Sequence, residues 1–195
     1  MARDEIDIAA ASAIPFAALA NPQVRLLGQV SEGMVAVFRD QVAASAGEDP
    51  LAIELCTTGG DAEMGRLLAQ EVRQLRQTGR RVVFLGKTTV YSAGVTMMAA
   101  FPVADRFLTR DAVLLIHCRR MDEQVHFEGP LKSCLIQAKV HVAKMEAGIE
   151  LEREGFCELI EGSDVSFNEV TKKAVTNWYV PAQEALDRRL IAGLI

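Results

Sequence analysis

The stretch TTVYSAGVTMMAAFP, Thr88 to Pro102, joins two kinds of sequence at one serine. Before Ser92 the chain carries a run of β-formers that begins at Arg81, and after it come small and apolar residues typical of a buried helix. The stretch therefore predicts a strand that turns directly into a helix. In parallel α/β sheets such junctions lie at the carboxyl ends of strands, where helix N-termini present free N–H groups and ligands bind.

The same succession of strand and helix precedes this stretch twice, and a fourth strand follows it. The expected strands are 23–30, 51–58, 80–86 and 111–118, and the expected helices are 32–47, 61–77 and the segment from Ser92 to Pro102. Strands of nearly continuous apolar character joined by helices are typical of a parallel sheet covered on both faces. We therefore predict an α/β fold with parallel strand pairing.

The C-terminal part has a different pattern. The polar segment RRMDEQVHFEG precedes a long helix, predicted over 130–154, whose apolar residues recur at alternating spacings of three and four. Such a narrow stripe predicts packing against a partner helix or subunit. Ser166 and Glu169 form a capping box for another short helix, and Pro181 begins the last one. The stripe consists of Leu135, Ala138, Val142, Met145 and Ile149.

Composition excludes several classes of protein. The 195 residues are half hydrophobic, which predicts one globular domain over 1–195. The net charge of −5 and the scattered basic residues argue against nucleic-acid binding. The four cysteines have no regular spacing, so we expect reduced core residues of a cytosolic protein and no metal site. No window approaches the roughly 20 apolar residues that span a bilayer. In the segment 1–22, acidic residues outnumber Arg3 and Pro15 interrupts the apolar run, so no signal peptide is expected.

Three features could carry chemistry, and each has a plain structural alternative. Ser92 is either a nucleophile at a strand-to-helix turn or a helix cap. The pair Gly59-Gly60 in TTGGD either brings backbone N–H groups close to a ligand or only forms a tight turn. His117 ends an apolar strand at the same expected sheet edge, as a base for Ser92 or as a hydrogen-bonded core residue.

The order of these motifs resembles the proteolytic-subunit family of the Clp protease (ClpP), serine peptidases with the ClpP/crotonase fold. The resemblance runs from Val24 to the C-terminus. It rests on the segments VRLLGQV, ELCTTGGDAEMG, VYSAGVTMMAAF, VLLIHC and VPAQEALDRRLIAGLI, which occur in the family's order and at matching spacing.

The resemblance implies a spiral core of repeated β-β-α and βαβ units, over about 20–118 and 175–195, with a protruding long-helix handle over about 119–174. It implies a serine endopeptidase with Ser92 as nucleophile, His117 as general base and the amides of Gly60 and Ala93 as oxyanion hole. No cofactor or metal is implied. The implied partners are peptide or unfolded protein substrates, further copies of the chain in hexameric or heptameric rings that can stack, and an ATPase unfoldase. The implied location is the cytoplasm.

The sequence departs from the family at the third triad position, which falls on Asn177. An asparagine oxygen can accept a hydrogen bond from an imidazole but adds no charge. In the well-studied serine proteases the loss of that charge costs about 10⁴ in turnover. Three carboxylates, Asp164, Glu184 and Asp187, are candidate substitutes.

Two further departures concern assembly. The segment CRRMDEQVHFEG is charged where the family has a glycine-rich strand for peptide binding and ring stacking, and the leader before Val24 is short for docking an unfoldase. The first alternative function, which Asn177 motivates, is a catalytically weak or inactive ClpP-like structural subunit of a mixed ring. The second is a crotonase-type acyl-CoA enzyme, against which the Ser92–His117 pair argues, because those enzymes use carboxylates.

Overall fold

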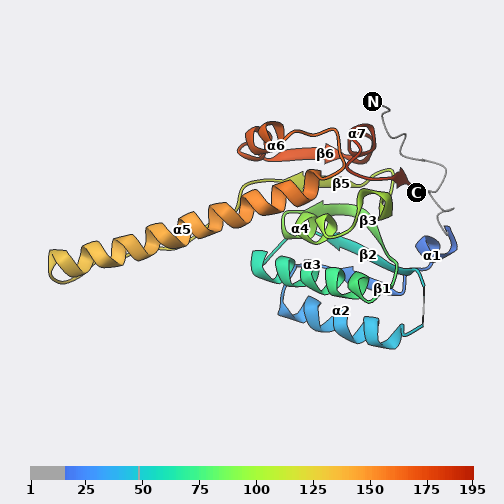
Figure 1. The fold of residues 1–195 in the computed structure, drawn as a ribbon, viewed down its shortest axis with the longest axis horizontal. Coiled ribbons are helices and arrows are strands. Elements are labelled where there is room, and N and C mark those ends of the chain that lie inside the picture. Colours follow the sequence, from blue (N-terminus) through green and yellow to red (C-terminus); the bar gives the residue numbers. More distant parts are fainter. Residues whose placement is uncertain (1–15, 48) are drawn as a thin grey trace, which may run out of the picture.

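A mixed β-sheet forms the centre of the protein, and helices lie along it (Figure 1). The computed structural model describes residues 16–47 and 49–195. In this part of the chain the strands β1-β2-β3-β4-β7 are all parallel, and β5 and β6 extend the sheet from the end of β3. The strands are β1 (Val24–Leu27), β2 (Leu51–Thr57), β3 (Val82–Tyr91), β4 (Arg106–Leu108), β5 (Val113–Ile116), β6 (Trp178–Pro181) and β7 (Gly193–Leu194).

The helices alternate with the strands along most of the chain. They are α1 (Phe16–Ala20), α2 (Glu32–Ala44), α3 (Ala62–Gln77), α4 (Ala93–Ala99), a 3-10 turn η2 (Val103–Asp105), α5 (Leu131–Ile160), α6 (Phe167–Ala174) and α7 (Ala182–Asp187). The α/β fold and its three strand–helix units are confirmed. The Ser166 cap is also confirmed, because its hydroxyl accepts from the Glu169 N–H, but the Glu169 carboxylate pairs with Lys173 and Arg188 rather than completing a capping box.

Strand β3 changes its neighbour part-way along its length. Residues 84–86 pair with β4, whereas residues 89–91 pair with β5, in a register that sets Tyr91 opposite Leu115. The chain therefore leaves β3 for α4 beside the end of β5. This change of partner brings Ser92 and His117 to the same edge of the sheet.

The four predicted strands, β1, β2, β3 and β5, pair in parallel, whereas β6 was not predicted as a strand. This strand runs antiparallel to β5, with Ile116 opposite Trp178. A four-residue strand that ends at a proline carries too little alternation to be recognised in the sequence. The antiparallel pairing matters for the site. Because Ile116 lies opposite Trp178, the next position of the register places Asn177 beside His117.

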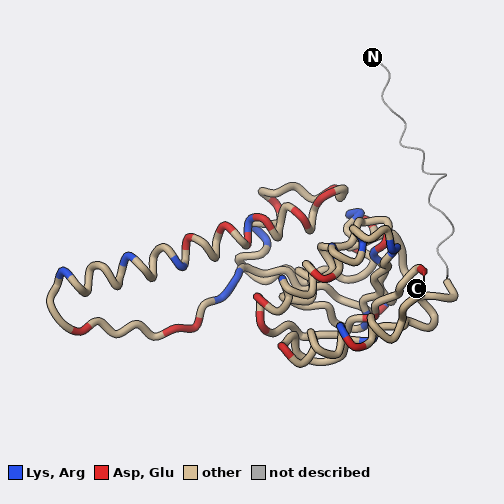
Figure 2. Tube along the Cα trace, turned by 60° about the horizontal axis from the view of Figure 1, so that its bottom comes forward, with Lys and Arg blue, Asp and Glu red and all other residues tan. Residues whose placement is uncertain are grey.

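Helix α5 projects from the body as a long arm. The segment 119–130, which precedes it, runs outward from the body alongside the helix (Figures 1 and 2). The two are joined by a Lys144–Glu123 ion pair of 2.6 Å and by an edge-to-face contact between the rings of Phe127 and His141. The arm ends at Ile160 rather than 154, because its last turns enter the body, where Phe156 and Leu159 are buried. Four of the five stripe residues are exposed: Leu135, Val142, Met145 and Ile149.

A buried arginine holds the base of the arm against the body. Arg106 is 1% exposed, and its guanidinium donates only to backbone carbonyls. These belong to the end of α4, the end of α5 and the loop before β7: Ala99, Phe101, Glu158, Leu159 and Leu190. Burial lowers the pKa of Arg106 to about 10, which still leaves it charged at neutral pH. The two helices that Arg106 joins, α4 and α5, form opposite walls of the cavity described below.

The remaining sequence predictions have mixed outcomes. The four cysteines are free thiols, and Cys118 packs against the core, but none is fully buried and Cys157 is exposed, so the prediction of core cysteines is wrong for Cys157. The acidic residues and Pro15, which argued against a signal peptide, and the start of the short leader all fall in 1–15, outside the described residues. None of the helices in the described part combines the length and hydrophobicity that crossing a bilayer requires.

Candidate active site

Ser92 sits in a strained turn between β3 and α4. Its backbone is left-handed, with φ 56° and ψ −115°, and its side chain makes no capping hydrogen bond. By contrast, Ser31 and Ser166 have extended backbones and accept hydrogen bonds from Met34 and Glu169 as ordinary caps. Non-glycine residues in such conformations are strained and concentrate at functional sites. Simple capping therefore does not account for Ser92.

The glycine pair of the TTGGD segment packs directly against this serine. A methyl group at Gly59 would lie 2.8 Å from Ser92 Cβ, so only glycine permits the approach. The turn is held by the Thr57 hydroxyl, which accepts from the Gly59 N–H at 3.0 Å. Gly60 is equally constrained, because a methyl group there would meet the Val30 carbonyl at 2.3 Å. The two motifs singled out in the sequence are thus in contact.

Two backbone N–H groups at this junction have no hydrogen-bond partner among the described residues. The bridge between Val30 and Gly60 uses the Gly59 carbonyl and the Asp61 N–H, which leaves the Gly60 N–H unused. Ala93 is the first residue of α4, where a helix offers no internal acceptor for the N–H. Both residues line one cavity together with Ser92. Such a pair of donors can stabilise a negative oxygen.

His117 follows β5 and lines the same cavity. The strand ends are tied together, because the Ser92 N–H donates to the Leu115 carbonyl at 2.9 Å. His117 Nδ1 lies 2.6 Å from the Cys118 carbonyl oxygen, which can only accept. Nδ1 therefore carries the proton in this contact and Nε2 the lone pair. No hydrogen bond joins Ser92 and His117 in the described structure, so their pairing stays a prediction.

Asn177 is the neighbour of His117 by strand register but does not contact it by a hydrogen bond. Its backbone has φ 62°, and its Oδ1 accepts from Arg120 Nη2 at 3.4 Å. The three candidate substitutes are engaged elsewhere: Asp164 pairs with Arg189, Glu184 with Arg188, and Asp187 accepts from Gln183. None of them lines the cavity. Asn177 does not line the cavity either, but it is the candidate that the strand register places beside His117.

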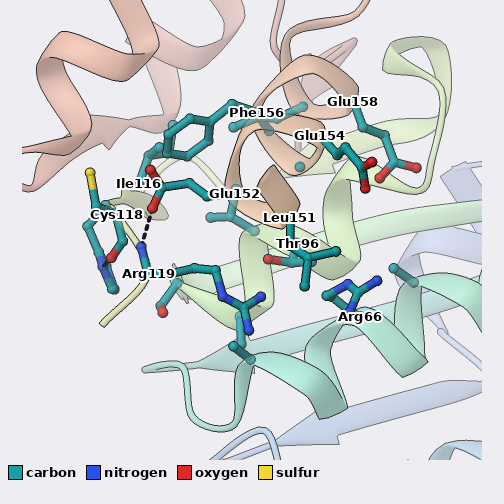
Figure 3. Close-up of a pocket in the computed structure, with 18 of the residues that line it drawn as sticks. Arg66, Thr96, Ile116, Cys118, Arg119, Leu151, Glu152, Glu154, Phe156 and Glu158 are labelled. Carbon is teal, nitrogen blue, oxygen red and sulfur yellow. Dashed lines mark hydrogen bonds between the residues drawn. The ribbon is translucent and has the colours of Figure 1, made fainter. Parts of the chain in front are cut away.

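The cavity has a volume of about 650 Å³ and lies between α3, α4, the end of β5 and the base of α5 (Figure 3). Charged side chains line much of it, and Figure 3 shows Arg66 and Arg119 opposite the glutamates of α5. Glu152 accepts from the Arg119 N–H, which fixes the chain after His117 to α5. Burial and the Glu152 carboxylate raise the pKa of the Cys118 thiol, so this neighbour of His117 is no thiolate nucleophile.

Sequence reasoning missed Arg119, Arg120 and Glu152 as site residues. The charged segment after His117 differs from the family's glycine-rich peptide-binding strand, so its residues were not considered part of the site. A single glutamate in the long helix gives no sign in the sequence that it lies near the site. The only available signal was proximity, because Arg119 and Arg120 follow a candidate base within three positions. Among the described residues no group of three or more His, Cys, Asp or Glu side chains is placed to hold a metal ion.

Comparison with known proteins supports the fold. No family model matches the chain, and no curated protein sequence matches it. Among solved structures, the chain is similar to an asparagine-to-aspartate mutant of ClpP1 from Listeria monocytogenes, with a TM-score of 0.69. The chain has the ClpP fold. The similarity covers 93% of this chain and 96% of the Listeria chain at 20% sequence identity, so the ClpP likeness is one of fold.

Proposed function

We propose that the protein is a ClpP-like serine endopeptidase that hydrolyses peptide bonds through an acyl-enzyme at Ser92. The observation that carries this proposal is the strained, uncapped Ser92 beside two N–H groups without partners, those of Gly60 and Ala93. A side chain held at a strained turn against unused donors suits attack on a carbonyl carbon.

In the proposed reaction, His117 Nε2 takes the proton from Ser92 Oγ as this oxygen attacks the scissile carbonyl. The carbonyl oxygen becomes an anion, which the N–H groups of Gly60 and Ala93 stabilise. The imidazolium then gives its proton to the leaving amine, and the peptide bond breaks. Water, deprotonated by His117, hydrolyses the resulting ester and restores Ser92.

The proposed base is oriented by neutral groups. The Cys118 carbonyl accepts from Nδ1 and so holds the tautomer that leaves Nε2 free. Asn177 lies next to His117 in strand register, but its oxygen is taken up by Arg120. Among the described residues no carboxylate is hydrogen-bonded to His117, which predicts a slow peptidase.

Hydrolysis of a fluorogenic peptide and of unfolded casein tests the proposal. Wild type should cleave both, and Ser92→Ala should lower the rate by at least about 10³-fold, as expected for loss of a serine nucleophile. Ser166→Ala is the matched control, because Ser166 is an ordinary cap outside the cavity. It should reduce stability by about 1 kcal/mol but leave cleavage unchanged. Equal rates for wild type and Ser92→Ala would refute the proposal.

A catalytically weak subunit of a mixed ring is the second candidate function. The observation that favours it is the absence of a Ser92–His117 hydrogen bond in the described structure, together with the contact from Arg120 to Asn177. Under this alternative the purified chain would cleave neither substrate and would gain activity only when mixed with a competent homologous subunit.

We further propose that the chain forms hexameric or heptameric rings that can stack, through the exposed stripe of α5. An apolar stripe on a long arm is unstable in water and suits packing against the same stripe of a second copy. Sedimentation velocity should show an oligomer that Ile149→Glu converts to smaller species. Ala147 lies nine residues, or two and a half turns, after Ala138 and so on the face opposite the stripe. Ala147→Glu should therefore leave the oligomer intact. A wild-type monomer at micromolar concentration would contradict this.

A further inference from the structure

One cationic side chain in the cavity has no anionic partner. Four arginines line the cavity, and three of them pair with carboxylates: Arg66 and Arg119 with Glu63, and Arg73 with Glu158. Arg120 differs. Among the described residues its side chain has one hydrogen bond, a 3.4 Å contact with the neutral Asn177 oxygen, and no ion pair.

The surroundings do not supply the missing charge. Glu152, an α5 carboxylate on the cavity wall, is engaged by the Arg119 N–H and the Cys118 thiol. Glu154 also lines the cavity but lies two residues further along α5, about 200° around the helix from Glu152. Arg120 is exposed and belongs to the cavity lining, so a dissolved anion can reach it.

Arg120 also lies beside the proposed reacting groups. It contacts Asn177, the residue directly before β6. The last pair of the antiparallel register is Ile116–Trp178, so the next position places Asn177 opposite His117. A carboxylate bound to Arg120 would therefore lie next to the base. A guanidinium binds a carboxylate through two charge-assisted hydrogen bonds, which are stronger than its single long bond to an amide oxygen.

We propose that Arg120 is a specificity-determining residue that selects peptide substrates with a carboxylate near the scissile bond. The inference rests on the proposed peptidase function and names the substrate class of that site. The carboxylate is either an Asp or Glu side chain or the free C-terminus of the peptide. Binding of that group also removes Arg120 from Asn177, whose oxygen is then free to face His117.

Fluorescence anisotropy with labelled peptides tests this on Ser92→Ala, which binds without cleaving. Three peptides differ at one group: Glu with an amidated C-terminus, Gln with an amidated C-terminus, and Gln with a free C-terminus. We expect one of the two carboxylate peptides to bind about tenfold more tightly than the neutral one, and which one does identifies the source of the carboxylate. Adding Arg120→Gln should bring the ratio to about one. Arg110→Gln, an exposed arginine outside the cavity, should leave the ratio unchanged.

The outcomes separate the two proposals. A preference that survives Arg120→Gln, equal binding of the three peptides, or no binding of any of them would overturn the role of Arg120. Hydrolysis by wild type of the neutral peptide, without preference, would overturn Arg120 but keep the peptidase. A preference that depends on Arg120 in a wild-type protein that hydrolyses no peptide would keep Arg120 as a carboxylate-binding residue and overturn the peptidase.

Discussion

The two halves of the candidate site are built in different ways. The nucleophile half, Gly59-Gly60 and Ser92-Ala93, is fixed by backbone contacts in the core, where Ala93 is 3% exposed and a single added methyl group would clash. The base half, His117 to Arg120 with Asn177, is half-buried or exposed, and long or charged surface contacts hold it between the body and α5. The nucleophile half is thus set by folding, whereas the base half can rearrange without unfolding the protein.

The largest expected effect concerns the base. His117→Ala should lower peptide hydrolysis by about 10²–10⁴-fold, the usual contribution of general acid–base catalysis, with little change in melting temperature. His141→Ala is the control, because His141 lies on the arm beside Phe127 and outside the cavity. Similar losses from the two variants, measured with the same fluorogenic peptide, would show that His117 has no special role.

Gly60→Ala tests whether the nucleophile half is as rigid as its packing indicates. Its methyl group would displace Val30 and move the Gly60 N–H, so hydrolysis should fall by about 10²–10³-fold, as for loss of an oxyanion donor. Gly28 also has a positive φ, of 99°, but nothing lies within 4 Å of an added methyl group. Gly28→Ala should therefore lower the melting temperature while retaining activity. Full activity in Gly60→Ala would contradict the oxyanion assignment.

Asn177→Asp tests whether the base half can be completed. The new carboxylate would stabilise the charge of the His117 imidazolium, but Arg120, which already contacts residue 177, would form an ion pair with it. We expect a gain in kcat of less than about tenfold for Asn177→Asp alone, and a larger gain for Arg120→Gln with Asn177→Asp, with about 10⁴ as the upper bound. The measurement is turnover of a neutral peptide. Unchanged turnover in both variants would mean that another group orients His117.

The smallest expected effect is a pH dependence at the edge of the base half. Partial burial would raise the pKa of Glu63, but hydrogen bonds from Arg119 and Arg66 outweigh it and lower the pKa below its ordinary value of 4.5. The contact with Arg119 is therefore complete above pH 4.5 and lost as the pH falls through the lowered pKa. The NMR signal of the Arg119 side chain should move only in that acid range. Movement between pH 5 and 8, or the same titration in Glu63→Gln, would exclude Glu63 as the cause.

The backbone geometry of the nucleophile half could be predicted from the sequence, whereas the contacts of the base half could not, for a physical reason. The apolar strands, the glycine pair and the small residues after Ser92 are each required by local backbone geometry, so they leave local signals. The contacts of Asn177 with Arg120 and of Arg119 with Glu63 join residues more than fifty positions apart. Such surface contacts depend on tertiary geometry, which no local pattern specifies.

The same reasoning explains two differences between the predicted and the observed fold. The long helix was predicted to end at about Glu154, yet it continues to Ile160 because Phe156 and Leu159 gain burial in the body. Strand β6 was not predicted as a strand, because its four residues are too few to carry a pattern. In both cases tertiary packing outweighs a weak local signal.

The most direct measurement of the central claim is reaction with a fluorophosphonate, followed by mass spectrometry of the labelled peptide. If Ser92 is activated by His117 and faces the amides of Gly60 and Ala93, the adduct should form on Ser92. His117→Ala should slow its formation, and His141→Ala should not. A protein that forms no adduct, or forms it on another serine while Ser92 stays unmodified, would contradict the account.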